Sequence, residues 1–139
     1  MSALDQLKTA LETALAADPA LQAVLGDPLR LAPARSRHLA YPHASWGRMT
    51  CQARGSDDTD LVECRLTLEI WCRDSDAHAV TGQVRQRIRA LSPVLPAGVQ
   101  LISIEPVYAD VFQTANQRLQ RGLVRIRALL QAQAEEITP

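Results

Sequence analysis

Several features that would direct a chain to a membrane, to nucleic acid or to secretion are missing from this sequence. There is no run of about 18 apolar residues, so we expect no membrane span and no membrane partner. The formal net charge is +0, so no overall field attracts nucleic acid or anionic lipid. No basic region with an apolar stretch follows Met1, and we therefore expect no secretion signal. Lysine is almost absent: Lys8 is the only one among 15 basic residues, and arginine is the better residue for planar, bidentate contacts at interfaces.

The motifs of the common enzyme classes are absent as well. The sequence contains no G-x-S-x-G, no P-loop, no H-E-x-x-H and no G-x-G-x-x-G. His38 and His43 lie five residues apart, but no third ligand accompanies them, so solvated loop histidines are favoured over a metal site. Asp57, Asp58 and Asp60 lack the spacing of a calcium loop. We predict no metal, no cofactor and no enzymatic activity.

The three cysteines are Cys51, Cys64 and Cys72, and none belongs to a CxxC motif or a Cys/His cluster. In one continuous strand Cys64 and Cys72 would be about 26 Å apart, which excludes a disulfide between them. We interpret the cysteines as small buried thiols in a reducing cytoplasm. Cys51 as a nucleophile is disfavoured, because nothing nearby in the sequence is placed to lower its pKa.

The 139 residues suit one domain that buries a core of its own. The clearest pattern lies between Thr59 and Ala90, where a strand leads into an amphipathic helix. One strand face is apolar and the other is mixed; the apolar side holds Cys64, Leu66, Leu68, Ile70 and Cys72, and the other Glu63, Arg65, Thr67, Glu69 and Trp71. Residues 73–76 offer helix-capping oxygens, and apolar residues then recur at helical spacing up to Leu91.

The rest of the chain predicts two helices before this unit and two strands after it. A helix over residues 2–17 is capped by Ser2, and a short one starts at Asp18-Pro19 and ends at Gly26. Residues 27–40 predict an irregular connection. An edge strand is expected over 41–51, and further strands over 99–112 and 119–130.

The predicted order is helix, short helix, strand, strand, helix, strand, strand. Two hairpins separated by a helix indicate an α+β fold, with an antiparallel sheet of about four strands and helices packed on one face. We expect a single α+β domain over residues 1–130 and a flexible C-terminal tail over 131–139, which is polar.

The second face of the strands is the unusual feature of the sequence. Arg65 and Trp71 share a strand face, and Arg125 and Arg127 flank leucines on another. Aromatic residues and arginine are enriched at protein interfaces, so we take these four as candidate interface residues. An ordinary exposed sheet with one stray tryptophan is an equally good interpretation. A polar hairpin tip, with candidate contacts of its own, is formed by Gly55, Ser56, Asp57 and Asp58.

The arginines at 85, 87 and 89 raise the alternative of a nucleic-acid-binding module. On a helix Arg85 and Arg89 share a face and Arg87 lies elsewhere. Glutamines rather than aromatic residues stand between them, so a solvated or subunit-contacting helix face is favoured.

Four stretches together resemble a family of tailed-phage proteins, the tail terminator or tail completion proteins of siphophages, prophages and gene transfer agents. They are residues 15–21 (LAADPAL) with Leu25-Gly26 after them, the aromatic–proline pair Tyr41-Pro42, residues 68–73 (LEIWCR) before a helix, and residues 122–127 (GLVRIR). The resemblance covers about residues 4 to 130. Residues 43–46 (HASW) are more polar than the family's usual apolar run, and Cys72 stands where a small hydroxyl residue is common.

The resemblance implies a structural role without chemistry. Such proteins form a ring, usually of six subunits, at the head-proximal end of the tail tube; the ring stops tube polymerisation and joins the tail to the capsid neck. The implied partners are other copies of the chain, the major tail tube protein, the head–tail connector or stopper protein, and DNA that passes through the lumen without sequence specificity. The implied location is the tail or neck of a virion or virus-like particle, after assembly in the bacterial cytoplasm. A connector or stopper neck protein is the alternative.

Overall fold

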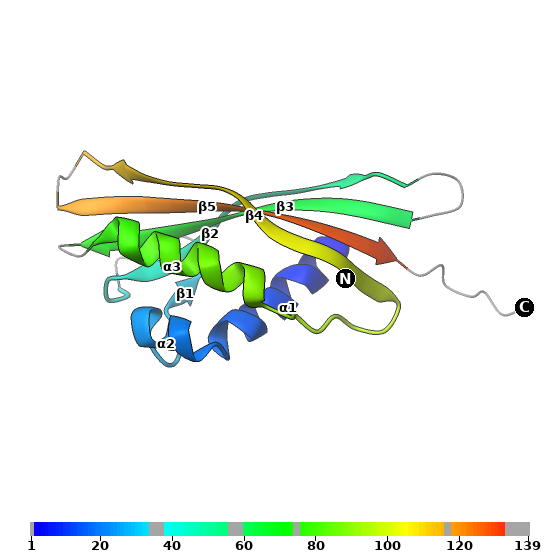
Figure 1. Cartoon of the computed structure of the whole chain (residues 1–139), viewed down its shortest axis with the longest axis horizontal. Coiled ribbons are helices and arrows are strands. Elements are labelled where there is room, and N and C mark those ends of the chain that lie inside the picture. Colours follow the sequence, from blue (N-terminus) through cyan, green and yellow to red (C-terminus); the bar gives the residue numbers. More distant parts are fainter. Residues whose placement is uncertain (1, 34–37, 56–59, 74–75, 116–117, 133–139) are drawn as a thin grey trace, which may run out of the picture.

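The computed structural model describes residues 2–33, 38–55, 60–73, 76–115 and 118–132. It confirms the α+β class: three helices lie on one side of a sheet (Figure 1). In chain order the elements are α1 (Ala3–Ala16), α2 (Pro19–Leu25), β1 (Leu31–Ala32), β2 (His43–Ala53), β3 (Asp60–Arg73), α3 (Ala77–Ala90), β4 (Val99–Gln113) and β5 (Leu119–Ala132). Among these residues, none of the helices has the length and apolarity required to cross a bilayer.

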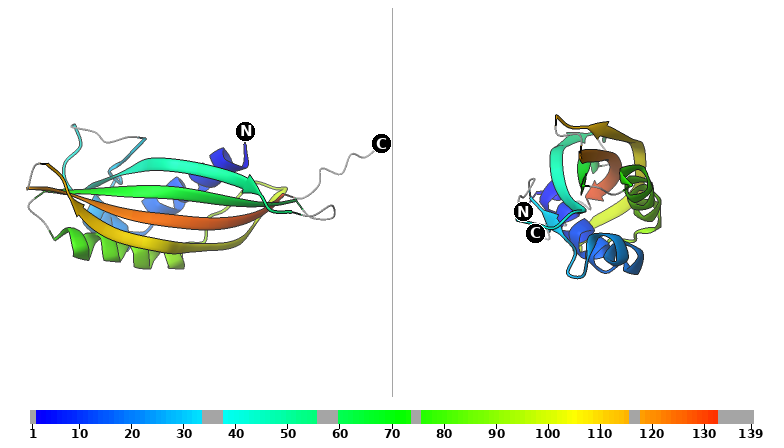
Figure 2. Two further views of the ribbon diagram at one scale, coloured as in Figure 1. Left: turned by 90° about the horizontal axis from the view of Figure 1, so that it is seen from above. Right: turned by 90° about the vertical axis from the view of Figure 1, so that its left-hand side faces the viewer.

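The sheet has five strands in the order β1-β2-β3-β5-β4, and its four long strands run side by side along the molecule (Figure 2). β2, β3, β5 and β4 are joined by antiparallel pairs, as predicted. The short β1 is an addition to the prediction, because it lies inside the connection expected to be irregular. It pairs in parallel with Ala44 and Ser45, so only the remainder of β2 is the sheet edge that the sequence predicted.

The helix ends follow the predicted caps. Ser2 Oγ accepts a hydrogen bond from the backbone N–H of Asp5, and Asp76 caps α3 in the same way. Pro19 opens α2 behind the cap Asp18, and Gly26 ends the helix with a positive φ of 93°. These local signals fix where each helix begins and ends.

The core lies between the helices and the apolar face of the sheet. The alternation predicted for β3 is observed, since Leu66, Leu68 and Ile70 are buried beneath the helices. β5 adds Val124, Ile126, Ala128 and Leu130, and the helices add Leu7, Leu11, Leu15, Leu21, Leu25, Val84 and Ile88. Burial of these aliphatic side chains is the main source of stability.

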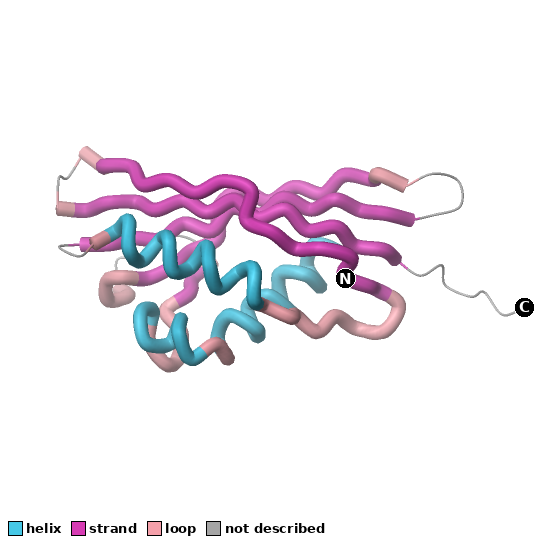
Figure 3. The backbone as a smooth tube through the Cα atoms, in the orientation of Figure 1, coloured by secondary structure: helices cyan, strands magenta, loops and turns pink. Residues whose placement is uncertain are grey.

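α3 crosses β3, β5 and β4 on the helix side, as the backbone trace shows (Figure 3). It approaches β5 closely at Gly122, where a Cβ atom would collide with Thr81 Oγ1. Glycine is therefore required at this position by space, because the helix could not lie this close to a strand that carried a side chain there.

Asp18 joins α2 to α3. Its Oδ1 accepts hydrogen bonds from the backbone N–H groups of Ala20 and Leu21, and its Oδ2 accepts one of 2.9 Å from Arg87. Burial opposes ionisation of this carboxyl, but the hydrogen bond from Arg87 and those from the backbone outweigh it and lower the pKa of Asp18. Arg87 thus has a structural partner, whereas Arg85 and Arg89 are exposed.

Two expectations about cysteine and histidine are wrong. Cys51 is not a buried thiol: it is exposed and forms a disulfide with Cys64, its direct partner in the β2–β3 ladder. The two residues are on adjacent strands, a proximity that spacing along the sequence does not show. His43 is not a solvated loop residue, because it lies in β2 and is fully buried, with its ring 5.0 Å from that of Tyr41. Cys72 is a buried free thiol, as expected.

The last strand runs to Ala132, two residues past the predicted end of the domain at 130. Residues 133–139, for which a flexible tail was predicted, lie outside the described residues, so that expectation stays a prediction.

Candidate functional site: the helix-free face of the sheet

The face of the sheet opposite the helices carries a cluster of arginines around one glutamate. Glu63 is 5% exposed and accepts side-chain hydrogen bonds from three strand or strand-end residues. Arg127 Nε and Arg65 Nε donate to its Oε1 at 2.9 and 3.1 Å, and Arg54 Nε donates to its Oε2 at 2.9 Å. Arg127 also lies 3.6 Å from Glu105 on β4. This cluster therefore connects β3, β5, β4 and the residue that follows β2 through ion pairs.

The strand register explains why these groups meet. Arg65 of β3 and Arg127 of β5 are direct partners, and Glu63 lies two residues before Arg65 on the same face. The hydrogen bond from Arg127, followed by that from Arg54, lowers the pKa of Glu63 to about 2, although burial acts in the opposite direction. The same contact raises the pKa of Arg127. Glu63 is thus ionised in the folded protein and holds its arginines in defined positions.

A second feature of this face is a pair of arginine–aromatic contacts between β5 and β4. The guanidinium of Arg125 lies 5.3 Å from the ring centre of Tyr108, and that of Arg121 lies 5.6 Å from the ring centre of Phe112. A shallow hollow of about 370 Å³ opens beside them, and it is lined by Arg48, Thr50, Arg65, Leu66, Thr67, Glu69, Val107, Leu123, Arg125 and Ile126. The face thus offers arginines and apolar surface together, a composition typical of protein interfaces.

The structure brings together three of the predicted interface residues. Arg65, Arg125 and Arg127 all line the helix-free face, on two neighbouring strands. Gly55 follows β2 at the end of the sheet where the β2–β3 connection begins. Ser56, Asp57 and Asp58 lie outside the described residues, so a docking role for this tip stays a prediction.

Trp71 does not lie on the exposed part of this face. Its side chain is 7% exposed, its Nε1 donates a hydrogen bond of 2.9 Å to Ser45 Oγ, and Ser45 is itself fully buried. Strand alternation alone did not show this burial, to which His43 and Ser45 on the same side of β2 contribute. Trp71 is also six residues from Arg65 along β3, or about 20 Å. Its role at an interface stays a prediction.

Sequence reasoning missed two groups of residues. The first is Glu63 as the centre of the arginine cluster; its position on the same strand face was visible, but its burial was not. The second is a set of exposed apolar residues on β4, which we name the apolar edge: Ile102, Val107, Tyr108 and Phe112. Register shifts in β4 interrupt its alternation, so the periodicity gave no clear signal there.

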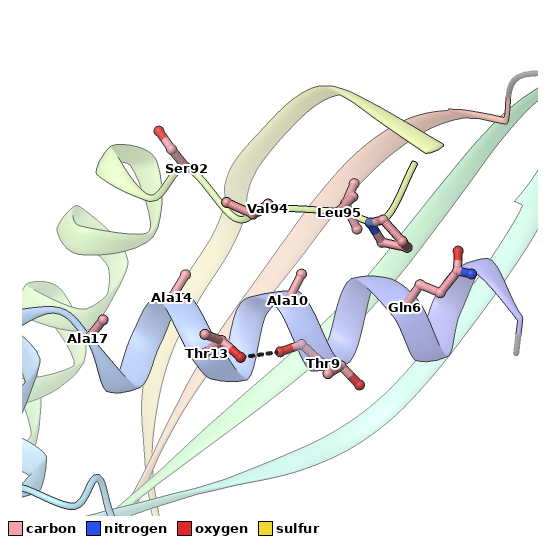
Figure 4. A pocket seen from close by; sticks show the side chains of 10 residues that line it. Gln6, Thr9, Ala10, Thr13, Ala14, Ala17, Ser92, Val94 and Leu95 are labelled. Atoms are coloured by element: carbon pink, nitrogen blue, oxygen red, sulfur yellow. Dashed lines mark hydrogen bonds between the residues drawn. The ribbon is translucent and has the colours of Figure 1, made fainter. Parts of the chain in front are cut away.

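The helix side of the molecule has a different hollow. α1 and the segment 92–96 enclose an apolar groove of about 580 Å³, shown in Figure 4. It is lined on one side by Ala10, Ala14 and Ala17 and on the other by Val94 and Leu95. None of its lining residues is charged, and the polar ones are Gln6, Thr9, Thr13 and Ser92.

No arrangement for metal binding is present in the parts of the chain that the structure describes: three or more histidine, cysteine or carboxylate side chains do not meet anywhere in them. The interactions on the helix-free face are ion pairs and hydrogen bonds between strands. The surface presents fixed charges and apolar groups over a broad sheet, a composition typical of protein interfaces.

Comparison with known proteins agrees with this description. The family described as tail completion protein gp17 matches residues 9–131. A solved chain described as "Virion of native gene transfer agent (GTA) particle" has the same fold, with a TM-score of 0.79, 18% sequence identity, and coverage of 94% of this chain and 98% of that chain. No curated protein sequence matches. Tail completion proteins are structural components of virion tails and not enzymes. The match spans nearly the whole chain, and the protein therefore belongs to the tail completion protein gp17 family.

Proposed function

We propose that this tail protein is a tail terminator. In this proposal several copies, six by expectation, form a ring at the head-proximal end of the tail tube. The ring stops tube polymerisation and joins the finished tail to the neck of the capsid, while DNA passes through its lumen. The protein acts by occupying a position and offering surfaces, and it needs no catalytic group.

The observation that carries this proposal is the organisation of the sheet. Helices cover one face, and the other face presents arginines whose side chains are held by Glu63. A surface with ordered charges loses less side-chain freedom on binding than one with mobile arginines, so it suits a permanent structural contact. The formal net charge of +0 agrees with a conduit that must release DNA.

Within this proposal, Arg65, Arg125 and Arg127 contact the tube protein or a neighbouring subunit, and the tip that starts at Gly55 docks on the tube or lines the lumen. The particle partners are then the major tail tube protein on one side and the connector or stopper protein on the other. The protein is located at the tail or neck of a phage-type or gene transfer agent particle.

The decisive experiment removes the protein from the producing cell and examines the particles by electron microscopy. Loss of a terminator should give tails of uncontrolled length that are not joined to heads, whereas loss of a connector or stopper should give tails of normal length. Supply of the wild-type protein in trans should restore joined particles. Tails of normal length joined to heads in its absence would contradict both roles.

The surface assignment has a separate test with a matched control. Arg125→Ala removes an exposed arginine from the helix-free face, and Arg85→Ala removes an exposed arginine from α3 on the other side. Both variants should fold like the wild type, but only Arg125→Ala should reduce the yield of joined particles. An equal yield from the two variants would argue against the helix-free face as the assembly surface.

A further inference from the structure

We infer that the apolar edge of β4 in one copy of the chain pairs with the open part of β2 in the next copy, so that the sheet continues from subunit to subunit. This inference rests on the proposed ring and names the contact that would build it. Five observations support it. They are the exposure of apolar side chains on β4, the two unpaired strand edges, the directions of the strands, the positions of the two edges along the sheet, and their charges.

The exposed large apolar side chains of the described residues are concentrated on one strand. Four of the five lie on β4, including Ile102 at 45% and Val107 at 50% exposure. β4 is also the outermost strand, since among the described residues it pairs with β5 alone. A long apolar edge strand has unpaired backbone groups and invites pairing with another chain. α3 packs against β4 on the helix side and Glu105 and Asp110 are charged residues of the strand, but its four large apolar side chains stay exposed.

Ile102 and Val107 have a special position within β4. They are the residues skipped at the two register shifts, between Leu101 and Ser103 and between Pro106 and Tyr108. A skipped residue has no direct partner on β5, so these two apolar residues make no pair inside the sheet. Pro106 beside Val107 offers no N–H, which is tolerated at a sheet edge. An added strand would give both side chains a place to bury.

The opposite edge of the same sheet is open as well. β1 pairs only with Ala44 and Ser45, so the part of β2 from Trp46 to Ala53 has no strand on its outer side among the described residues. One chain therefore carries two different open edges. A contact between two different surfaces of identical chains is head-to-tail, and it closes into a ring when the rotation between copies allows it.

Strand direction fits such a contact. β2, β3, β5 and β4 alternate in direction, because each neighbouring pair is antiparallel. With an even number of long strands, β4 of one copy and β2 of the next run in opposite directions when both copies point the same way along the ring axis. The junction would then be one more antiparallel pair, and the alternation would continue around the ring.

The two edges also match in their position along the strands and in their charge. Following the register across the sheet, Glu105 of β4 is level with Arg127, Arg65 and finally Thr50 of β2. The open part of β2 is thus level with the β4 segment that holds Ile102, Val107 and Tyr108. Within the matching segment of β4 the charged residue is Glu105, whereas Arg48 in β2 and Arg54 just after it are the charges of the other edge; Asp110 is level with Ser45, which pairs with β1. Opposite charges would therefore meet across the junction.

A ring built in this way would leave a channel. With about 4.8 Å between neighbouring strands, a closed sheet of six such copies would be about 37 Å across or wider. Closed sheets with fewer strands than this already leave an aqueous channel. The inferred contact is therefore compatible with the passage of DNA. In such a ring the helix-free face lines the channel, and the contacts proposed for Arg65, Arg125 and Arg127 are then made at the end of the ring that meets the tube.

The first test compares two exposed valines. Val107→Lys places a charge in the apolar edge, and Val94→Lys places the same charge in the segment after α3, where the valine is 86% exposed. Oligomer formation is measured by light scattering and sedimentation in solution, and binding is measured on isolated tails that lack the protein. Val107→Lys should weaken association by at least about tenfold, while Val94→Lys should leave it unchanged. Circular dichroism checks that both variants fold.

The second test exchanges charges between the edges. Glu105→Arg and Arg48→Glu should each weaken association, and both substitutions in one chain should restore it. Within a single chain the two positions are on opposite edges of the sheet, separated by two strands. If the double variant associates like the wild type, the restoring contact must therefore lie between two copies.

The outcomes separate this inference from the proposed function. If the wild type and both valine variants associate equally, the β4–β2 junction is wrong but the ring stands. If the double charge variant associates no better than the single ones, the junction is also wrong. If the wild type forms no oligomer either in solution or on tails, the ring itself fails, and the inference fails with it.

Discussion

The two faces of one sheet follow different rules in this protein. On the helix side, Leu66, Leu68 and Ile70 are fully buried and any residue of similar volume and apolarity would serve. On the other side, one residue away along the same strand, Arg65 is held by a specific hydrogen bond to Glu63. The first face is held by non-directional burial and the second by directional charge contacts. The fold therefore depends mainly on the first face, and the proposed assembly contacts use the second.

The largest expected difference in stability is between substitutions at two neighbouring residues of β3, one on each face of the sheet. Leu66→Ala removes a fully buried side chain and should lower the free energy of unfolding by about 2–5 kcal/mol. Arg65→Ala removes an exposed member of the arginine cluster and should cost less than about 1 kcal/mol. Urea unfolding followed by circular dichroism measures both. Equal costs at the two positions would show that the faces do not differ as described.

The disulfide between Cys51 and Cys64 allows a test of the pairing between β2 and β3. Cys51→Ser should lower the free energy of unfolding by about 3 kcal/mol under oxidising conditions, because the bond closes a loop with a sequence separation of 13. The wild type in the presence of a reductant should match the variant. If reductant leaves the thermal midpoint of the wild type unchanged, the two cysteines are thiols in solution, as the sequence alone suggested.

The close approach of α3 to the helix side of the sheet is tested at Gly122. Gly122→Ala should cost about 1–3 kcal/mol, since the new Cβ collides with the side chain of Thr81. Thr81→Ala in the same chain should recover part of this loss, because it removes the colliding atoms. A double-mutant cycle on the free energy of unfolding measures this coupling. Additive effects would mean that the helix moves away from the strand instead.

The smallest expected effect is the pH dependence of stability that Glu63 contributes on the helix-free face. The pKa of Glu63 is about 2 in the folded protein, below its ordinary value of 4.5, so ionisation of this residue stabilises the fold above pH 4.5. That contribution is lost as the pH falls from 4.5 to 2. Glu63→Gln should therefore give a flatter acid-unfolding profile over this interval than the wild type.

The matched control is Glu105→Gln, which alters a half-exposed carboxylate with one arginine at 3.6 Å. Its acid-unfolding profile should remain steep. A profile of Glu63→Gln that coincides with that of the wild type would show that the three hydrogen bonds do not lower the pKa of Glu63 in solution.

Most of the fold could be predicted because its signals are local. Ser2, Asp18 and Asp76 mark helix starts through their capping oxygens, and the alternation in β3 and β5 marks the buried face. β1 could not be predicted, since a strand of two residues has no periodicity. The family was visible in the order and spacing of four short stretches, and the match over residues 9–131 confirms it.

The candidate site could be predicted only in part. Alternation grouped Arg65 with Trp71 on one strand face and Arg125 with Arg127 on another, but it could not show that Trp71 is buried. Whether a strand residue is covered depends on what packs against it, here His43 and Ser45 from the neighbouring strand. The apolar edge went unnoticed because two bulges interrupt the period of two in β4.

By itself the sequence determined the helix ends, the buried face of the long strands and the family, because each depends on neighbouring residues or on their order along the chain. Only the tertiary structure decided which residues from distant segments meet. It placed Cys51 against Cys64, surrounded Glu63 with three arginines, and left β4 and part of β2 as the two open edges. The physical reason is that pairing between strands depends on register and strand order, and these are fixed by packing of the whole domain.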